Sequence, residues 1–585
     1  MIEITVMNHE TENSKLEAMR HTAAHMLAAA SRVLKPDTKL GVGPAIENGF
    51  YHDLDTAERY TDADLAKLQK EMFKIKNKNL EITQREISKA EARELFKDDE
   101  YKLELIDEIE GDTVGISDMG DGFFVTLCRG GHVHSTGEVG FFKLTHLAGA
   151  YWKGDEKRAQ LQRVYGLLFE TEEELEKHLF RIEEAKKRDH KILGPQLGIF
   201  MFHESSPGMP YWLPKGMAIL NELTEFWRKE HRERGYHEIS TPLINKKELW
   251  ETSGHWEHYH EDMFIADMGE NEIYGVKPMN CPNAMIVFGS QLRSYRELPL
   301  RLSDVDILHR YERSGTLNGL LRVRSFRQDD SHNFVTEDQI EEEYRQILDI
   351  ADKFYKIFGL TYRLRLATRP EKFLGSEETW DKAEAALRRI LDEKIGSGNH
   401  AVAEGDGAFY GPKVDIVMED ALGREWQMGT IQLDFQQPQR FNLAYTDATG
   451  AKKTPVVIHR VIYGSLDRFI GLLIEHYAGA FPLWLSPVQV KLLPIADAQH
   501  DYTNALAQQL RVMNIRVETD SRSESIGKKI REAQKEKVPV MLIIGKKEVE
   551  ENTVAVRSRT KGDEGSKSID QFIQDLTLQI SSKSL

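Results

Sequence analysis

A highly charged helical segment between residues 170 and 190 most constrains how this chain can fold. It reads ETEEELEKHLFRIEEAKKRDH and is mostly charged outside a narrow apolar stripe. A helix with so little apolar surface is not packed on all sides, and such helices often bridge two domains. The segment therefore predicts a separate N-terminal domain over residues 1–169, a linker helix over residues 170–191 and further domains beyond it.

The remainder of the chain changes pattern near Ser486 and Pro487. Beyond that point the stretches QVKLLPI, IRVETD and VPVMLIIG read as strands, with helical stretches between them. Such alternation predicts a small α/β domain with a largely parallel sheet over residues 487–585. Residues 192–486 mix long helices with strands and predict a domain of their own. The expected helices cover residues 19–34, 62–78, 88–96, 217–234, 340–358, 380–395, 501–513 and 526–536, and the clearest strands cover 414–418 and 426–435.

Composition excludes some classes of protein and leaves others open. The formal net charge of −17 argues mildly against a nucleic-acid partner, although only the distribution of charge decides this. Two cysteines cannot form a disulfide framework, which favours a reducing cytoplasm. The N-terminal residues do not resemble a secretory signal, and no apolar run reaches the roughly 18–20 residues of a membrane helix. We expect a cytoplasmic protein without a membrane partner.

The first cysteine has histidines at suggestive spacings. His21 and His25 are four residues apart in a predicted helix, so their side chains share one face, and Cys128 and His132 form the stretch CRGGH. The two pairs could build a shared polar pocket or a metal site, or could arise by chance among 21 histidines. The second cysteine, Cys281, has no histidine nearby, and spacing alone favours an ordinary buried thiol.

An arginine-rich run between residues 309 and 334 gives the strongest local indication of chemistry. HRYERSGTLNGLLRVRSFRQDDSHNF alternates like two strands across a glycine-containing turn, and its arginines are interleaved with acids. Guanidinium groups on paired strands suit a polyphosphate because each can donate two parallel hydrogen bonds. A solvated charged hairpin is the alternative interpretation. The sequence has no GxxxxGK[ST] loop, which disfavours a P-loop ATPase.

This run resembles motif two of the class II aminoacyl-tRNA synthetases, and its details are similar to the threonine-specific branch. KPMNCPNAM, GLLRVRSFRQDDSHNF, AFYGPK, WQMGTIQLDF and HRVIYGSLDRFIGLLIEH follow in the order of that family. The resemblance implies an α+β multidomain fold. Its parts are an N-terminal α+β editing domain, a class II antiparallel sheet flanked by helices, and a C-terminal α/β anticodon-binding domain.

The resemblance also implies an activity and its partners. Threonine would be activated with ATP and Mg²⁺ to threonyl-adenylate and pyrophosphate, and then transferred to the 3′ end of tRNA(Thr). Residues 235–242, GYHEISTP, resemble motif one and imply a homodimer. Arg310 resembles the arginine on the α-phosphate, Glu312 the acid near the adenine, and Arg322 the arginine at the outer phosphates. Arg468 is similar to the arginine of motif three.

Recognition of threonine is implied by a second set of residues. The resemblance assembles Cys281, His332 and His459 into one zinc site per subunit, which in this family binds the amino group and hydroxyl of threonine. His255 resembles a histidine implicated in transfer to tRNA. The residues expected to line the amino-acid pocket are Gln328, Asp330, Tyr410 and Gln432.

Two further sites follow from the same resemblance. Serine differs from threonine by one methyl group, worth roughly 1–3 kcal/mol, so a second, hydrolytic site is the expected remedy. The set that resembles this editing site, which works without metal in the threonine branch, is His21, His25, Cys128 and His132. Glu548 and Arg557 fall where the family reads anticodon bases, and Lys528, Lys529 and Arg531 form a basic cluster that could meet phosphates or could be an ordinary charged helix.

Departures from the family pattern keep alternatives open. A small N-terminal domain common in bacterial members is expected to be missing. MNCPGH becomes MNCPNA, Thr126 stands where an aspartate is common, Gly131 replaces a proline, and Ser523 replaces an asparagine. The alternatives are a synthetase for serine or proline, a catalytically inactive RNA-binding paralogue, and a stand-alone hydrolase. The cysteine–histidine trio disfavours a synthetase for serine or proline, and the three motif arginines disfavour an inactive paralogue. A stand-alone hydrolase would leave most of the chain unexplained.

Overall fold

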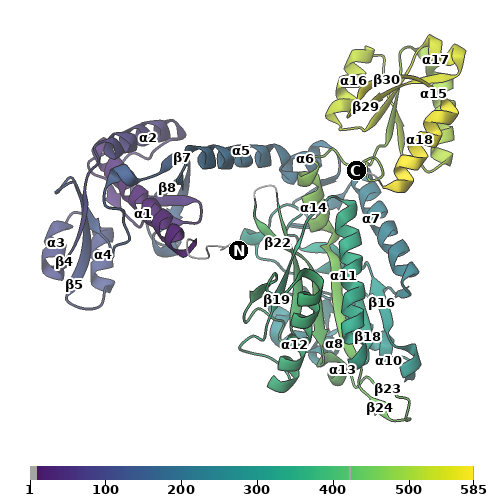
Figure 1. Ribbon diagram of the computed structural model, residues 1–585, viewed down its shortest axis with the longest axis horizontal. Coiled ribbons are helices and arrows are strands. Elements are labelled where there is room, and N and C mark those ends of the chain that lie inside the picture. The colour runs from purple at the N-terminus through teal and green to yellow at the C-terminus, as the bar shows by residue number, and fades with distance from the viewer. Residues whose placement is uncertain (1–8, 421–422, 584–585) are drawn as a thin grey trace, which may run out of the picture. The chain divides into compact units, whose positions relative to one another are not determined.

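The computed structural model describes residues 9–420 and 423–583 (Figure 1). It divides into two compact units, Met1–Glu183 and Glu184–Leu585, with the division inside the charged helix α5 (Glu172–Arg188). Among the helices of the described residues, none has both the length and the apolar character needed to cross a membrane.

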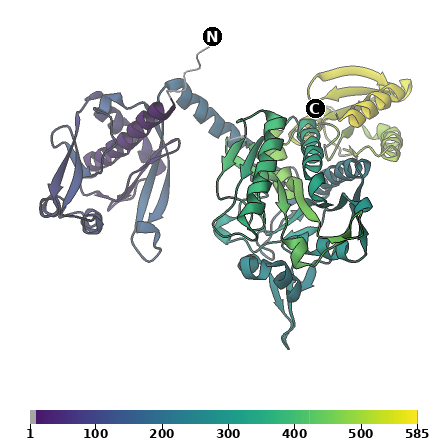
Figure 2. The same cartoon turned by 60° about the horizontal axis from the view of Figure 1, so that its bottom comes forward.

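The N-terminal unit contains two antiparallel sheets. One has the order β1-β3-β8-β7 with β2 beside β3, and helix α1 packs against β3 and β8. The purple and blue ribbons of Figures 1 and 2 are this unit. The other has the order β4-β5-β6. Both expected helices after α1 are confirmed, as α2 and α3. The strands are β1 (Lys39–Leu40), β2 (Ala45–Ile46), β3 (Gly49–Asp55), β4 (Ile82–Ser88), β5 (Thr113–Met119), β6 (Phe124–Leu127), β7 (Phe141–Tyr151) and β8 (Gln160–Phe169), and the helices are α1 (His9–Leu34), α2 (Asp62–Asn77), α3 (Lys89–Leu95) and α4 (Glu100–Glu108).

A nine-stranded, mostly antiparallel sheet dominates the second unit. Its order is β11-β16-β18-β25-β22-β21-β19-β20, with β17 paired to β18. Only the pairs β11–β16 and β19–β20 are parallel within it. The strands are β11 (Tyr236–Glu238), β16 (Leu300–Asp304), β17 (Ile307–His309), β18 (Ser325–Val335), β19 (Arg363–Ala367), β20 (Ala401–Ala403), β21 (Lys413–Glu419), β22 (Glu425–Asp434) and β25 (Val456–Ser465). The remaining small strands are β9 (Phe200–Met201), β10 (Tyr211–Trp212), β12 (Ile244–Lys246), β13 (Ile265–Asp267), β14 (Ile273–Val276), β15 (Arg293–Ser294), β23 (Tyr445–Thr446) and β24 (Lys452–Lys453).

Helices cover one face of this sheet, and the opposite face carries the cavity described below. Apolar side chains of α7, α11, α12 and α14 form one large buried cluster with Ile431, Leu433 and Ile458 from the strands. The alternate residues of β18, β22 and β25 point to the opposite face, because successive strand residues alternate. The predicted helices and the strands β21 and β22 are confirmed. The helices are α6 (His190–Gln196), α7 (Pro214–Glu233), α8 (Lys247–Ser253), α9 (His255–Tyr259), α10 (Cys281–Gly289), α11 (Ile340–Ile357), α12 (Glu377–Ile395), α13 (Gln437–Arg440) and α14 (Leu466–His476).

The arginine-rich run forms a wider hairpin than expected. Strands β17 and β18 pair as antiparallel neighbours, but the chain between them is a loop over residues 310–324 rather than a tight turn. The loop closes on itself at a bridge between Asn318 and Arg322. Arg310 and Arg322 therefore lie on the loop and not in the strands.

The C-terminal region has a mixed sheet of order β27-β26-β28-β29-β30. Strand β26 is parallel to β27 and β28, as predicted, whereas β28–β29 and β29–β30 are antiparallel. The expectation of a largely parallel sheet is correct for β26, β27 and β28, whereas the connections from β28 to β29 and from β29 to β30 are too short for a parallel crossover. The elements are β26 (Val490–Pro494), α15 (His500–Val512), β27 (Val517–Thr519), α16 (Ile526–Lys535), β28 (Val540–Ile544), α17 (Lys546–Glu551), β29 (Thr553–Ser558), β30 (Gly562–Ser568) and α18 (Ile569–Ser582).

Candidate active site and editing pocket

A cavity of about 510 Å³ opens on the free face of the central sheet. Strands β18, β22 and β25 supply most of its floor, and the loop over residues 310–324 supplies one wall. Ten residues singled out from the sequence line it: Cys281, Arg310, Glu312, Arg322, Gln328, Asp330, Tyr410, Gln432, His459 and Arg468.

Three guanidinium groups concentrate positive charge in this cavity. The Nε of Arg468 donates to Leu321 O at 2.9 Å, and one of its terminal nitrogens donates to Gln427 O at 2.8 Å. Burial lowers the pKa of Arg468, and the nearby charges of Arg310 and Arg322 lower it further. A polyanion relieves such repulsion and suits the fork geometry of arginine.

One of these cations is already paired with an acid. Arg322 Nε donates to the carboxylate of Glu312 at 2.9 Å, and both residues lie on the loop. Arg310 Nε donates only to a main-chain oxygen, that of Pro278, at 3.3 Å. The loop thus contributes two arginines and one carboxylate to the wall of the cavity.

Strand register brings the second cysteine and two distant histidines together. His332 of β18 lies directly opposite His459 of β25, and His459 lies directly opposite Gln432 of β22. Cys281 begins helix α10, and its thiol lies beside His459. The ligand atoms of Cys281, His332 and His459 all lie within 4.8 Å of one another.

The trio fits a metal ion. Neither ring nitrogen of His332 has a hydrogen-bond partner, and His332 is completely buried. His459 also leaves Nδ1 without a partner, while its Nε2 lies 2.8 Å from the Asp434 carboxylate. Unpaired buried nitrogens are costly, and a histidine backed by a carboxylate is the usual arrangement around a bound metal. Two imidazoles and one thiolate are suitable zinc ligands.

Polar groups surround the trio on the cavity side. The hydroxyl of Tyr410 donates to Gln432 Oε1 at 2.7 Å. Asn280 Nδ2 lies 3.3 Å from Asp330 Oδ2. Burial raises the pKa of Asp330 to about 6. Such a wall presents oxygen acceptors to the cavity, and Gln328 also lines it.

His255 lies outside the cavity wall. It begins α9 and is buried, with Nδ1 2.8 Å from Ser253 Oγ and Nε2 3.1 Å from the sulfur of Met279. Met279 itself lines the cavity. Burial lowers the pKa of His255 to about 4, so the ring is neutral at neutral pH.

The first cysteine lies among histidines in the N-terminal unit. Cys128 Sγ is 3.2 Å from His132 Nε2 and 3.7 Å from His21 Nε2. The rings of His21 and His132 stack with centroids 4.3 Å apart, and His25 approaches both. Helix α1 supplies His21 and His25 on one face, and the segment after β6 supplies the other two. The four ligand-type atoms lie within 4.8 Å of one another.

These histidines are held neutral. Burial lowers the pKa of His132 to about 3, and burial followed by the neighbouring histidines places that of His25 well below its ordinary value. The hydroxyl of Thr22 lies 3.1 Å from His132 Nδ1. Gly131 has φ +85°, which a proline cannot adopt, so the loop here departs from the proline-containing family pattern.

Two buried residues near this pocket, Lys102 and His52, were not predicted from the sequence. Lys102 of α4 is 4% exposed, donates to Gly41 O at 3.0 Å, and has its pKa lowered to about 8 by burial. Burial likewise lowers the pKa of His52 to about 3. The position of Lys102 between Tyr101 and Leu103 could have indicated an inward-facing lysine, because charged residues are seldom fully buried without a role.

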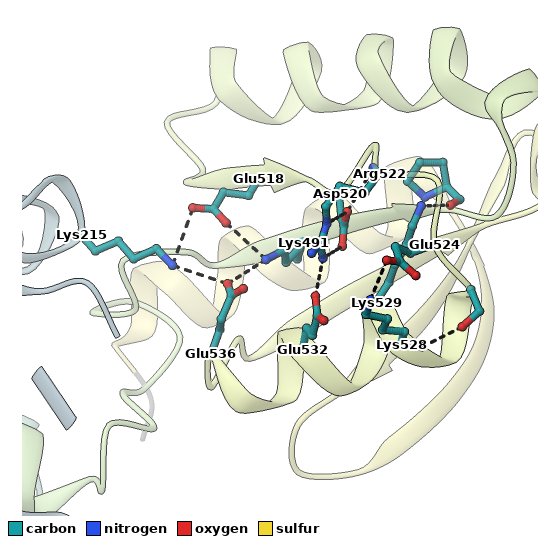
Figure 3. Close-up of polar contacts among 12 residues, drawn as sticks. Lys215, Lys491, Glu518, Asp520, Arg522, Glu524, Lys528, Lys529, Glu532 and Glu536 are labelled. Carbon is teal, nitrogen blue, oxygen red and sulfur yellow. Dashed lines mark hydrogen bonds and ion pairs between the residues drawn. The ribbon is translucent and has the colours of Figure 1, made fainter. Parts of the chain in front are cut away.

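The basic cluster of Lys528, Lys529 and Arg531 lies on α16 of the C-terminal region. Lys529 is 2% exposed, and its ammonium donates to Pro494 O at 2.9 Å (Figure 3). Lys528 pairs with Glu524 at 2.6 Å. Of the two interpretations left open for the cluster, contact with phosphates does not apply to Lys529, since its ammonium points into the domain.

The two residues predicted to read bases occupy neighbouring elements. Glu548 lies in the first turn of α17, where its carboxylate accepts the Gly545 N–H at 2.9 Å. Arg557 lies on β29, and its Nε has no hydrogen-bond partner. Helix α17 packs directly against β29.

Comparison with known families agrees with this geometry. Residues 264–477 match the tRNA synthetase class II core domain (G, H, P, S and T), and residues 489–577 match the anticodon binding domain. Residues 113–165 match the threonyl and alanyl tRNA synthetase second additional domain. The fold and the cavity thus define a class II aminoacyl-tRNA synthetase with an α+β multidomain architecture.

Individual relatives narrow the class. The threonine–tRNA ligase of Acetivibrio thermocellus is 50% identical over 570 residues, covering 97% of this chain and 89% of its own. That of Clostridium botulinum is 51% identical over 583 residues, covering 99% and 91%. This chain belongs to the threonine–tRNA ligase family.

Solved structures give the same assignment. The RNA binding domain of threonyl-tRNA synthetase from Cryptosporidium parvum is 44% identical, with a TM-score of 0.64 over 67% of this chain and 98% of that one. A putative threonyl-tRNA synthetase from Aeropyrum pernix is 29% identical, with a TM-score of 0.59 over 68% and 97%.

Proposed function

We propose that the cavity activates threonine with ATP and transfers it to tRNA, and that the N-terminal pocket hydrolyses mischarged Ser-tRNA. One observation carries the substrate assignment: Cys281, His332 and His459 converge, and two of them, Cys281 and His459, line a cavity whose wall holds three arginines. A nucleotide site beside a site that can recognise an alcohol is what threonine activation requires.

In the first step the threonine carboxylate attacks the α-phosphorus of ATP, and pyrophosphate leaves. Negative charge grows on the phosphoryl oxygens, so fixed cations stabilise the transition state more than the ground state. Arg310 would contact the α-phosphate, and Arg468 the opposite side of the nucleotide. Arg322 would meet the outer phosphates, which requires it to exchange its contact with Glu312 for the phosphate oxygens. Mg²⁺ would accompany ATP.

Selection of threonine would depend on the buried trio. A zinc ion held by Cys281, His332 and His459 would supply, when bound, a Lewis acid that takes the amino group and the hydroxyl of threonine as ligands. Valine lacks the hydroxyl and would be rejected strongly, whereas serine keeps it. Asp330, Gln328, Tyr410 and Gln432 would orient the substrate.

Editing would take place among the neutral histidines of the N-terminal pocket. Hydrolysis adds water to the ester carbonyl of Ser-tRNA and breaks the bond to the terminal ribose. His21, His25 and His132 can accept a proton from that water because their rings are neutral, and Cys128 lies within reach of two of them. We propose no metal there.

Several further assignments remain proposals. We infer a homodimer from the segment over residues 235–242, domain limits at residues 169, 191 and 486, and a cytoplasmic location. Glu548 and Arg557 would contact anticodon bases, since together they offer donors and acceptors. His255 would act in the transfer step only if Met279 moves aside.

The decisive experiment is amino-acid-dependent exchange of pyrophosphate into ATP, with threonine, serine and valine compared at equal concentration. We expect exchange with threonine and with serine, and a rate of exchange with valine that is lower by at least about a hundredfold. Valine exchange equal to that of threonine would contradict recognition of the hydroxyl. No exchange with threonine in zinc-replete enzyme would refute the proposed function.

A further inference from the structure

His190 is a completely enclosed side chain that the proposed mechanism does not use. It begins helix α6, directly after α5 ends at Arg188, and is 1% exposed. Asp189 caps the helix through a hydrogen bond from Lys191 N at 2.8 Å. Although an aspartate and a glutamate lie close to His190, both of its ring nitrogens are occupied by hydrogen bonds, which argues against a metal site.

The two hydrogen bonds of His190 fix its tautomer. Nδ1 lies 2.7 Å from Glu475 Oε1 and must donate to that carboxylate. The Leu320 N–H donates to Nε2 at 3.0 Å, so Nε2 must be the acceptor. His190 therefore joins three segments that are far apart in the sequence: the start of α6, the end of α14 and the loop over residues 310–324.

Leu320 is the point at which that loop is anchored. Leu321 N donates to Asn318 O at 2.9 Å, and Asn318 N donates to Arg322 O at 3.1 Å, so residues 318–322 form a closed turn. Leu321 O also accepts Arg468 Nε at 2.9 Å. The dipeptide that directly precedes Arg322 is thus held from one side by His190 and from the other by Arg468.

Two glycines leave the room that His190 needs. Gly319 has φ +50°, and a methyl group there would lie 2.2 Å from His190 Nε2. A methyl group at Gly471 of α14 would lie 3.2 Å from Leu320 Cβ and 3.6 Å from His190 Cδ2. Helix α6 packs against α14 (Figure 1). Because α14 carries Arg468 and Glu475, the imidazole of His190 connects the segments that carry Arg322 and Arg468.

We propose that His190 is a positioning residue for ATP, which holds the backbone of the 310–324 loop so that Arg322 faces the outer phosphates. The inference rests on the proposed roles of Arg322 and Arg468. His190 contacts neither substrate nor reacting atoms. When the Nε2 acceptor of His190 is lost, the loop occupies the ATP-binding conformation for a smaller fraction of the time. The apparent affinity for ATP falls in proportion to that fraction. Threonine binds on the sheet and should be unaffected.

The test uses two substitutions that separate the ring nitrogens. His190→Asn keeps a donor near the position of Nδ1 and removes the acceptor for Leu320 N–H. His190→Gln places an oxygen near the position of Nε2 and can keep that acceptor. We expect His190→Asn to raise the KM for ATP about tenfold in threonine-dependent exchange, with the KM for threonine within about twofold, whereas His190→Gln should restore most of the ATP affinity.

Controls and contrary outcomes are defined by the same assay. Ile192→Ala, at an exposed position of the same helix, should match the wild type. If His190→Asn does not fold, Gly319→Ala offers a second route, because its methyl group pushes the loop away from the imidazole and should raise the KM for ATP alone. The proposal would be overturned if the KM for ATP were unchanged in His190→Asn and in Gly319→Ala. It would also be overturned if the KM for threonine rose as much as the KM for ATP, or if His190→Asn and His190→Gln were equally impaired. Absence of exchange in the wild type would instead refute the proposed function.

Discussion

The two cysteine–histidine clusters of this molecule use the same residue types in opposite ways. In the cluster of Cys281, His332 and His459, three ring nitrogens are buried without a hydrogen-bond partner, and Asp434 backs one ring. In the N-terminal cluster, His132 contacts Cys128 and Thr22, and Cys128 is only partly buried.

The difference shows that residue composition does not define a metal site. Buried nitrogens that the fold leaves unpaired favour a bound ligand, whereas His132 of the N-terminal cluster already has Cys128 and Thr22 as neighbours. Both clusters bring their atoms within 4.8 Å, so proximity alone does not separate them.

The largest effect should follow from removing one ligand of the buried trio. Cys281→Ala is expected to lose its zinc and to reduce threonine-dependent exchange roughly a thousandfold, or about 4 kcal/mol, because the Lewis acid is lost. Metal analysis should find about one zinc per chain in the wild type. Cys128→Ala is the matched control and should keep both zinc and exchange. Equal loss of metal in the two variants would erase the distinction between the clusters.

The N-terminal cluster should respond in the complementary way. Cys128→Ala and His21→Ala should leave threonylation intact and slow the clearance of Ser-tRNA about a hundredfold, the usual contribution of positioned proton-transfer groups. The measurement is deacylation of preformed Ser-tRNA, followed by its accumulation during aminoacylation with serine. Clearance at the wild-type rate would remove the pocket from the editing reaction.

A smaller effect should distinguish the groups behind the ligands. Asp434→Asn keeps the oxygen that accepts Gln436 N and Gln437 N but can lose the acceptor for His459. We expect zinc affinity to fall about 10–100-fold in competition with a chelator. Thr22→Val removes the corresponding neighbour of His132 and should leave zinc affinity unchanged. Unaltered affinity in Asp434→Asn would show that the carboxylate does not support the ligand.

The smallest effect concerns acid. The folded-state pKa of His132, about 3, lies below the ordinary value of 6.5. Below about pH 6.5, His132 is protonated in the unfolded chain but remains neutral in the folded pocket. The free energy of unfolding therefore falls as the pH decreases toward 3. The loss is at most about 1.4 kcal/mol per pH unit for one histidine. Hydrogen exchange in residues 9–183 of the full chain, compared at pH 7 and 5.5, should show faster opening in acid. His132→Gln should lose less stability than the wild type, and equal losses would contradict this assignment.

Much of the fold was predictable from local pattern. The predicted helices over residues 217–234, 340–358 and 380–395 correspond to α7, α11 and α12, because their apolar positions repeat at helical spacing. The editing and zinc sets depended on recognising the family, since no spacing rule connects Cys281 with His459. The site members His52 and Lys102 were missed because inward-facing polar residues look ordinary in a sequence.

Some predictions needed contacts that no local pattern contains. The wide 310–324 loop depends on Asn318, Arg322 and the anchor at His190, and its glycine-containing sequence equally allowed a tight turn. Lys529 reads as a surface cation, but the turn of α16 directs it to Pro494 O. His255 resembles a histidine that acts in transfer to tRNA, but in the structure it contacts Met279, which lines the cavity, and does not line the cavity itself.

By itself the sequence determined the elements, the family and the residue types that the chemistry requires, because these follow from local periodicity and from motifs of contiguous residues. The tertiary structure alone decided that His332 lies opposite His459, that three of their nitrogens are left unpaired, and that His190 reaches Leu320. These facts depend on strand register and on packing between segments more than a hundred residues apart. Burial then makes the pairing of each polar atom energetically decisive.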